Sequence, residues 1–486
     1  MKEIFKTLNE SYQEIEKINS LEGIINCSKK YPINGASAKI EKSKNYYNFN
    51  ISLNEAIFRS NEISYNSLGF NNDFEIKTPF NEEYIIPYNE DSYENGGITN
   101  MTTKRFASTE NVKGKLISFH SKNFALEKPT YLRFFIPIGE DSFITKIEGQ
   151  AYKCDDTSYS YGLVKVAIFK HLIEIYRHEN NGIKYLIIES FDKVSFKDFK
   201  KTCYSVMKIL GILSGNWYRS ECYFLSYKNA NMINFSGLFF QSLKETIESG
   251  LKLIDPFHYR IYKREVDNKE IDYLKSIFPI QVFQTLIEKT CSNEAFSRAT
   301  ESLLEGLKNN SVFIRYNVYY VVIETLSNIF YKGVSKKPIK NTMALDNFSD
   351  NVKNLLNDYN EDFDEKEKEF ILKKIQHINN PFNADKVINL FSGFQIKMSP
   401  RYHKLIKNRN LFLHGKTSIK KEEEIKSNIA NLNEDASRVY LLCCILILKG
   451  TGYVGHIKNI TGEMNYQYNM NVRGENRIEE PLYFNI

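Results

Sequence analysis

The sequence of 486 residues contains no long apolar run and few cysteines. Its longest apolar stretch, Val439 to Leu448, is too short to cross a bilayer, and the first residues lack the apolar core of a signal peptide. The seven cysteines form no CxxC pair, and no group of cysteines and histidines has the spacing of a zinc site. We therefore expect a cytoplasmic protein with reduced thiols, no metal, no cofactor and no membrane partner.

A large excess of one charge is also lacking. The 65 basic and 59 acidic residues give a net charge of +6, which is too near balance for the whole surface to bind a polyanion. Locally the balance changes, because Arg401 to Lys421 contains seven basic residues and no acid, whereas Asp358 to Glu369 contains seven acids and two lysines. The first of these segments is expected to present a positive patch.

The N-terminal part of the chain has the pattern of a β-rich region. Between about residues 30 and 190, short runs of Tyr, Ile, Phe and Val alternate with Asn, Asp, Ser and Gly, which predicts strands bounded by turns. Ser195 is predicted to cap a helix that follows, and we place His171 and His178 in a further helix. Residues 1–275 are therefore expected to form a β-rich region, either a sandwich or barrel-like.

After residue 275 the hydrophobic period becomes helical. The candidate helices cover residues 281–307, 312–332, 349–357, 364–379, 384–391, 400–414 and 421–449. Short connections between them favour an antiparallel all-α bundle over residues 276–470, followed by a tail over 471–486. The expected fold class is thus a multidomain α+β protein.

The stretch KNRNLFLHGKTS, which begins at Lys407, lies at the end of one of these candidate helices. Ser399 and Pro400 have the character of an N-cap and a first helical residue, and Gly415 suits the position after the C-terminus. Helical spacing places Arg409 in the apolar stripe of this helix, and Asn410 on a polar stripe with His403, Lys407 and His414.

An arginine that faces a helical core needs a partner, because breaking a buried ion pair costs roughly 3 to 5 kcal/mol. The almost wholly apolar helix over residues 312–332 carries one polar stripe, which contains Tyr320 and Glu324. We therefore predict that Glu324 pairs with Arg409 and orients it.

The string RNLFLH, from Arg409 to His414, is similar to the R-x(4–6)-H signature of HEPN ribonuclease domains, including the polar residue after the arginine. A β-containing N-terminal region followed by a helical bundle that ends in this motif resembles the ApeA-like anti-phage defence proteins. The resemblance implies a HEPN-type bundle and a metal-independent endoribonuclease that acts in abortive infection.

The resemblance also implies roles for individual residues. The ribose 2′-hydroxyl attacks the adjacent phosphate, so His414 would move protons and Arg409 would stabilise the phosphorane charge. Asn410 would position these groups, and Glu324 would orient Arg409. Lys404, Lys407 and Lys416 would hold the RNA backbone through its phosphates.

The implied partners follow from the same family. RNA would be the substrate, with tRNA as one candidate, and a phage protein would be the trigger sensed by the N-terminal region. Two bundles of the family usually share one cleft, so a homodimer or higher homo-oligomer is expected.

Three other interpretations compete with this one. The letters HGKT suggest a phosphate-binding loop, but the Walker pattern requires glycine at position 410 and a preceding strand. Lys407 and Lys416 would also suit a basic helix end that interacts with the helix dipole. The alternative function, of a different class, is a non-catalytic HEPN-type module that binds nucleic acid or protein.

Overall fold

The computed structural model divides the chain into two compact units. The first comprises Met1–Lys308 with Gly455–Asn485, and the second comprises Asn309–Val454 with Ile486. The domain boundary predicted from the sequence lies at residue 275. The residues that the structure describes are 5–26, 34–53, 73–87, 98–106, 109–139, 143–249, 251–267, 269–272, 276–331, 339, 341–359, 363–376, 383–407, 422–469, 471 and 480–486.

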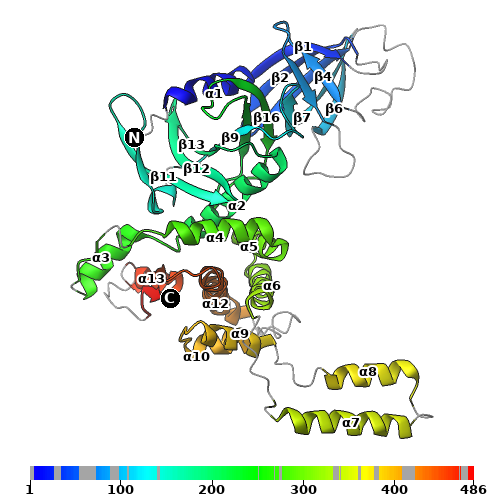
Figure 1. Ribbon diagram of the computed structural model, residues 1–486, viewed down its shortest axis with the longest axis vertical. Coiled ribbons are helices and arrows are strands. Elements are labelled where there is room, and N and C mark those ends of the chain that lie inside the picture. The colour runs from blue at the N-terminus through cyan, green and yellow to red at the C-terminus, as the bar shows by residue number, and fades with distance from the viewer. Residues whose placement is uncertain are drawn as a thin grey trace. The chain divides into compact units, whose positions relative to one another are not determined.

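The first unit is built on a large antiparallel sheet (Figure 1). In spatial order its described strands are β10 (Gln150–Lys153), β11 (Tyr159–Ile168), β12 (His171–Asn180), β13 (Ile183–Ser190), β9 (Tyr131–Pro137), β15 (Glu221–Tyr227), β16 (Phe235–Ser242), β8 (Ser118–Ser121), β5 (Glu83–Ile86), β4 (Phe74–Lys77), β1 (Ser20–Asn26), β2 (Ser37–Ser43), β3 (Tyr46–Leu53), β7 (Thr109–Leu116) and β6 (Ile98–Phe106). The predicted β-rich N-terminal region is therefore confirmed.

Two helices cover opposite faces of the sheet at its central strands. Helix α1 (Phe5–Lys17) packs on one face, where the ring centroids of Tyr12 and Phe135 lie 5.5 Å apart. Helix α2 (Phe196–Ser214) packs on the other, where Phe196 lies 5.1 Å from Phe224. Because side chains alternate along a strand, Phe135 and Phe134 of β9 face opposite helices. Strands β9 and β15 are consequently buried on both faces.

The helix predicted after Ser195 is present, whereas the helix predicted around His171 and His178 is wrong. Ser195 accepts a hydrogen bond from the backbone N–H of Asp198, and Gly215 ends α2 with a φ of 76°, a left-handed conformation that favours glycine. His171 and His178 instead lie on β12, which pairs with β11 on one side and β13 on the other. Ladder bonds on both sides hold this segment extended.

A fully buried arginine ties α1 to the sheet. Arg133 of β9 and Glu189 of β13 are each 1% exposed, and the Arg133 Nε donates to Glu189 Oε1 at 2.7 Å. The same guanidinium donates to the Thr7 carbonyl at 2.7 Å and to the Ser11 hydroxyl at 2.6 Å, both in α1. Tyr176 of β12 donates a further hydrogen bond to Glu189. One charged pair therefore links three strands and a helix.

The charge of Glu189 keeps Arg133 ionised in this interior. Burial is the largest single effect and lowers the pKa of Arg133, but Glu189, Tyr227 and Tyr176 together outweigh it, so the pKa is raised. Burial and the Glu189 charge also raise the pKa of Tyr176, which keeps that phenol protonated as a donor. The network thus remains a charged pair with its hydrogen bonds satisfied.

The remaining elements of the first unit attach to α2 and to one another. They are η2 (Phe143–Lys146), β14 (Asn216–Trp217), β17 (Ile247–Glu248), α3 (Pro256–Asp267), α4 (Ile280–Ser292), α5 (Glu294–Lys308), β18 (His456–Lys458), α13 (Ile460–Tyr468) and β19 (Tyr483–Asn485). Strand β19 comes from the predicted tail and pairs with β18.

The single helix predicted over residues 281–307 is two helices. The side chain of Asn293 accepts a hydrogen bond from the Phe296 N–H at 2.9 Å, so it caps α5 and separates it from α4. Helix α5 is joined to α2 by Lys208, whose Nζ lies 2.6 Å from Glu301. These contacts place α4 and α5 in the first unit.

The second unit is helical. Its described helices are α6 (Val312–Phe330), α7 (Thr342–Asp358), α8 (Glu365–Gln376), α9 (Asn383–Gly393), α10 (Pro400–Lys407) and α12 (Glu422–Lys449). Helices α6 and α12 pack together, with the rings of Tyr319 and Tyr440 at 5.5 Å, and both residues are buried. The expected helical C-terminal region is confirmed, and none of the described helices has the length and apolar character needed to cross a bilayer.

The buried pair in the sheet yields a stability prediction. Glu189→Gln should lower the free energy of unfolding by roughly 3 to 5 kcal/mol, because it leaves Arg133 buried without its counter-charge. Trp217, the only tryptophan of the chain, is buried in the first unit, so its fluorescence in a urea titration reports the unfolding of that unit.

Two further variants check this interpretation. Glu41→Gln removes a carboxylate that pairs with the exposed Lys39 and should leave the urea midpoint unchanged. Combining Arg133→Met with Glu189→Leu removes both charges and should recover part of the loss. Equal midpoints for Glu189→Gln and Glu41→Gln would contradict the role of the pair.

Candidate functional site

The described part of the predicted site lies on two helices of the second unit. Glu324 is on α6, and Lys404 and Lys407 are on α10. The other predicted site residues lie outside the described residues: Arg409, Asn410, His414 and Lys416. The structure shows how α10, which ends two residues before the RNLFLH motif, is held.

An ion-pair network holds the start of α10 against α12. Arg401 is the second residue of α10, and its Nη2 lies 3.4 Å from Glu434 and 3.3 Å from Asp435 of α12. The same two carboxylates lie 3.1 and 3.2 Å from the Nη1 of Arg438, whose side chain is completely buried. A buried cation thus fixes two acids on α12, and these acids hold Arg401.

The middle of α10 is held by α6. The hydroxyl of Tyr320, which is buried, donates a hydrogen bond to the backbone carbonyl of Leu405. Tyr402, Leu405 and Ile406 are all buried, which confirms this part of the predicted apolar stripe. Because these contacts hold one face of α10 against the unit, they also fix the direction in which its opposite face points.

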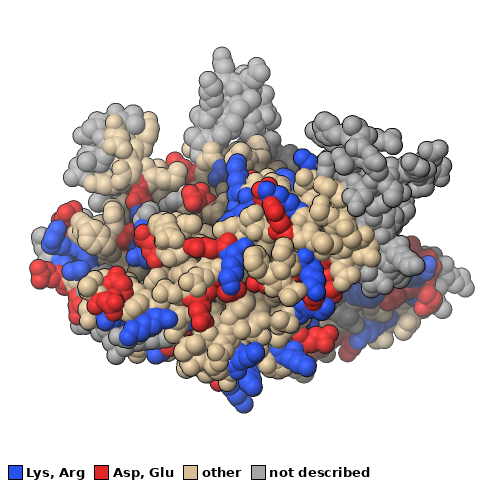
Figure 2. All heavy atoms as spheres, turned by 90° about the horizontal axis from the view of Figure 1, so that it is seen from above, with Lys and Arg blue, Asp and Glu red and all other residues tan. Residues whose placement is uncertain are grey.

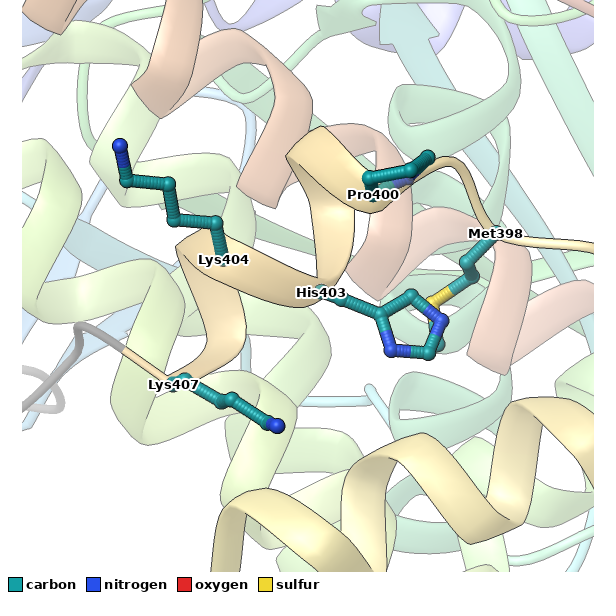
Figure 3. A pocket seen from close by; sticks show the side chains of 5 residues that line it. All are labelled: Met398, Pro400, His403, Lys404 and Lys407. Carbon is teal, nitrogen blue, oxygen red and sulfur yellow. The ribbon is translucent and has the colours of Figure 1, made fainter.

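The outer face of α10 borders an open pocket of about 520 Å³ (Figure 3). It is lined by Met398, Pro400, His403, Lys404 and Lys407. In Figure 3 the ring of His403 lies beside the Met398 side chain, and the two lysines extend from successive turns of the helix.

The charge at this pocket is positive. Lys404 and Lys407 are exposed, His403 is half-buried, and within the described part of the chain neither lysine makes an ion pair. Arg401, by contrast, is neutralised by α12. In Figure 3 Lys407 extends to the same side of α10 as the His403 ring and Lys404 to the other, so Lys407 and His403 suit the binding of a phosphate group, since a lysine ammonium is a compact charge with three donors.

This local excess differs from the charge pattern elsewhere. On the face drawn in Figure 2, basic and acidic side chains are interspersed, so neither sign dominates that face.

Among the described residues, no group of three or more His, Cys, Asp or Glu side chains is arranged to hold a metal ion.

Glu324 lies one helical turn after Tyr320 on the same side of α6 and is half-buried. Arg409 follows Leu405, the residue bonded to Tyr320, by the same interval of four residues. The hydrogen bond between Tyr320 and Leu405 thus joins the two residues that stand four positions before Glu324 and Arg409 in the sequence.

No family model matches the chain, and comparisons with curated proteins and with solved structures find no match either. A function for this chain therefore has to be argued from its residues and their geometry.

Sequence reasoning missed two contributors to this site. Arg401 was counted in the positive patch, but its charge is held by Glu434 and Asp435. A signal was present, because these acids precede Arg438 by four and three residues, the spacing of helical ion pairs. Met398 carries no such signal, since it precedes α10 and reaches the pocket only through the fold.

One other lysine of the described chain has an unusual setting, on α2 of the first unit. The Nζ of Lys200 lies 5.3 Å from the ring centroid of Phe239 and 5.7 Å from that of Phe196. Burial lowers the pKa of Lys200. These rings belong to the core between α2 and the sheet, so we assign Lys200 a packing role.

The anchor on α6 can be tested by hydrogen exchange. Tyr320→Phe removes the hydrogen bond to the Leu405 carbonyl, which is worth about 1 kcal/mol, so the amides of α10 should exchange about fivefold faster. Tyr319→Phe is the matched control, because Tyr319 is also buried on α6 and its hydroxyl makes no hydrogen bond within the described chain. Equal exchange of α10 in both variants would contradict the anchoring role.

Proposed function

We propose that this chain is a metal-independent endoribonuclease of HEPN type that acts in anti-phage defence by abortive infection. The second unit would be a HEPN bundle that cuts RNA, with tRNA as one candidate, and the β-rich region would sense a phage component. The observation that carries the proposal is the helix α10, which is held on its inner face and presents Lys404 and Lys407 without acidic partners among the described residues. The RNLFLH motif begins two residues after this helix ends.

The proposed reaction is an internal transesterification. The 2′-oxygen bonds to the adjacent phosphorus, the bond from phosphorus to the 5′-oxygen breaks, and the products carry a 2′,3′-cyclic phosphate and a 5′-hydroxyl. His414 would move the protons, and the guanidinium of Arg409 would stabilise the charge of the phosphorane. Asn410 would position these groups by a hydrogen bond.

Glu324 would orient Arg409 in this scheme. Support comes from its position on α6, one turn from the Tyr320 that holds α10. A half-buried carboxylate on a largely apolar helix would also compensate a guanidinium that turns inward.

Substrate binding would use the phosphates of the RNA backbone. Lys404, Lys407 and Lys416 would each contact a phosphate, and the pocket of α10 would accept one of them beside His403. Such contacts carry little sequence information, so selection of the target would come from the shape of the RNA. In the family two bundles line one cleft, and a homodimer or higher assembly is part of the proposal.

Replacement of the histidine tests the catalytic assignment. In the presence of a chelator, the purified protein should cut RNA to 2′,3′-cyclic phosphate ends, and His414→Ala should slow this cleavage by roughly 10² to 10⁴. His171→Ala is the control, because His171 lies on β12 of the first unit and should leave the rate unchanged. RNA binding without any cleavage by the unaltered protein would favour the alternative, a non-catalytic HEPN-type binding module.

Replacement of the lysines tests the binding surface separately from catalysis. With an RNA whose 2′-hydroxyls are methylated, binding proceeds but attack does not. Replacing Lys404 and Lys407 by glutamine should weaken binding and reduce the slope of log K against log salt by roughly 1.4, the value for two phosphates on a single strand. The control is Lys353→Gln, which removes an exposed α7 lysine paired with Asp350. An unchanged slope would place the RNA elsewhere.

A further inference from the structure

The pocket beside α10 joins an apolar wall to a positive charge. Pro400, His403 and Lys407 follow one another at spacings of three and four residues, so they share one face of the helix. Met398 precedes the helix, and its side chain lies beside the His403 ring (Figure 3). The N-terminal part of this face is therefore apolar and aromatic, and its C-terminal part carries the exposed ammonium of Lys407.

The lining also restricts the chemistry of a ligand. None of the residues that line the pocket is acidic, and Lys407 makes no ion pair within the described part of the chain. A matching ligand has an anionic group for Lys407 and a flat, weakly polar group for Met398 and His403. Inorganic phosphate lacks the second group, and an uncharged aromatic ring lacks the first.

The size of the pocket fits a ligand that carries both groups. Its volume of about 520 Å³ lies in the range of roughly 300 to 1,000 Å³ that small-molecule sites occupy. Pro400 and Lys407 are seven residues apart, which corresponds to about 10 Å along a helix axis. A nucleoside phosphate has an aromatic base at one end and a charged phosphate at the other, with one ribose between them. It therefore matches the pocket in volume and in the order of its groups.

The wall of the pocket is held by the rest of the second unit. Tyr320 donates a hydrogen bond to the Leu405 carbonyl, and the Nη2 of Arg401 lies 3.4 Å from Glu434 and 3.3 Å from Asp435. These contacts fix the inner face and the first turn of α10. Binding at the outer face consequently requires little ordering of the backbone, which lowers the entropic cost of association.

We propose that this face of α10 binds one nucleoside phosphate, with the base against the His403 ring and Met398 and the phosphate on Lys407. Imidazole rings stack on unpaired bases, and a thioether packs well against an aromatic ring. Stacking of this kind tolerates every base, so the site selects an unpaired nucleotide and not a sequence. The nucleotide is either free in solution or one residue of an RNA strand; only the RNA case rests on the proposed ribonuclease function.

A free nucleotide tests the site without any cleavage. Adenosine 5′-monophosphate, titrated calorimetrically into the full-length protein, should bind with a dissociation constant of about 10 μM to 1 mM. Adenosine and inorganic phosphate should each bind at least about tenfold more weakly, because each engages one end of the pocket. His403→Ala should weaken binding of the monophosphate about five- to 150-fold, the range for the loss of one stacking contact. Lys407→Gln should weaken binding of the monophosphate more than that of adenosine.

Two methionine variants provide a matched comparison. Met398 lines the pocket, whereas Met343 lies on α7 and is 75% exposed. Met398→Ala should weaken binding of the monophosphate, and Met343→Ala should not. Circular dichroism checks that the variants keep their helical content, and the exposed Lys407 provides a variant that leaves the packing of α10 undisturbed.

An RNA hairpin with methylated 2′-hydroxyls tests the second source of the nucleotide. A hairpin whose loop residues are all abasic should bind about five- to 150-fold more weakly than the intact one, and His403→Ala should remove this difference. Dependence of only the monophosphate on His403 would assign the site to a free nucleotide, and dependence of only the hairpin would assign it to RNA.

Two results would overturn the nucleotide site. One is that neither the monophosphate nor the hairpin loop depends on His403 and Met398, and the other is that inorganic phosphate binds as tightly as the monophosphate. Cleavage is measured separately. A protein that binds the monophosphate as described and cuts no RNA would contradict the proposed ribonuclease while supporting this site.

Discussion

The fold of the first unit depends on the burial of Arg133. A guanidinium cannot be taken out of water without a counter-charge and a set of acceptors, and both are supplied by neighbouring segments. Glu189 on the next strand gives the charge, and the backbone of Thr7 and the hydroxyl of Ser11 give the acceptors. Helix α1 is therefore part of the sheet core, where Tyr12 is buried beside it. The most N-terminal described helix thus takes part in the stability of strands far along the sequence.

The same physical rule shapes the helical unit. Arg438 is completely buried on α12, and the acids that compensate it, Glu434 and Asp435, have spare acceptor positions that hold Arg401. The acids that compensate the buried charge therefore also position α10. The cations that remain on α10 without described partners are fewer than the sequence suggests, and they all lie beyond the anchored first turn.

Local signals in the sequence predicted local structure, and non-local structure could not be predicted. Ser195 and Pro400 marked the starts of helices correctly, since a cap acts on its own turn. The extended conformation at His171 comes from pairing with strands on both sides, and the pairing of β9 with β13 and β15 joins distant segments. Arg401 illustrates the same limit at the site, because its charge is visible in the sequence and its partners are not.

Exposed lysines and exposed apolar side chains both remain on the helices of the second unit, and they differ in how strongly they indicate a binding partner. An exposed lysine such as Lys404 is well solvated, so its presence costs the protein nothing and indicates a site only through its neighbours. Exposed apolar side chains such as Leu355 and Phe370 of the second unit forgo burial worth roughly 1.5 to 3 kcal/mol each. Their exposure therefore carries a cost that a solvated lysine does not.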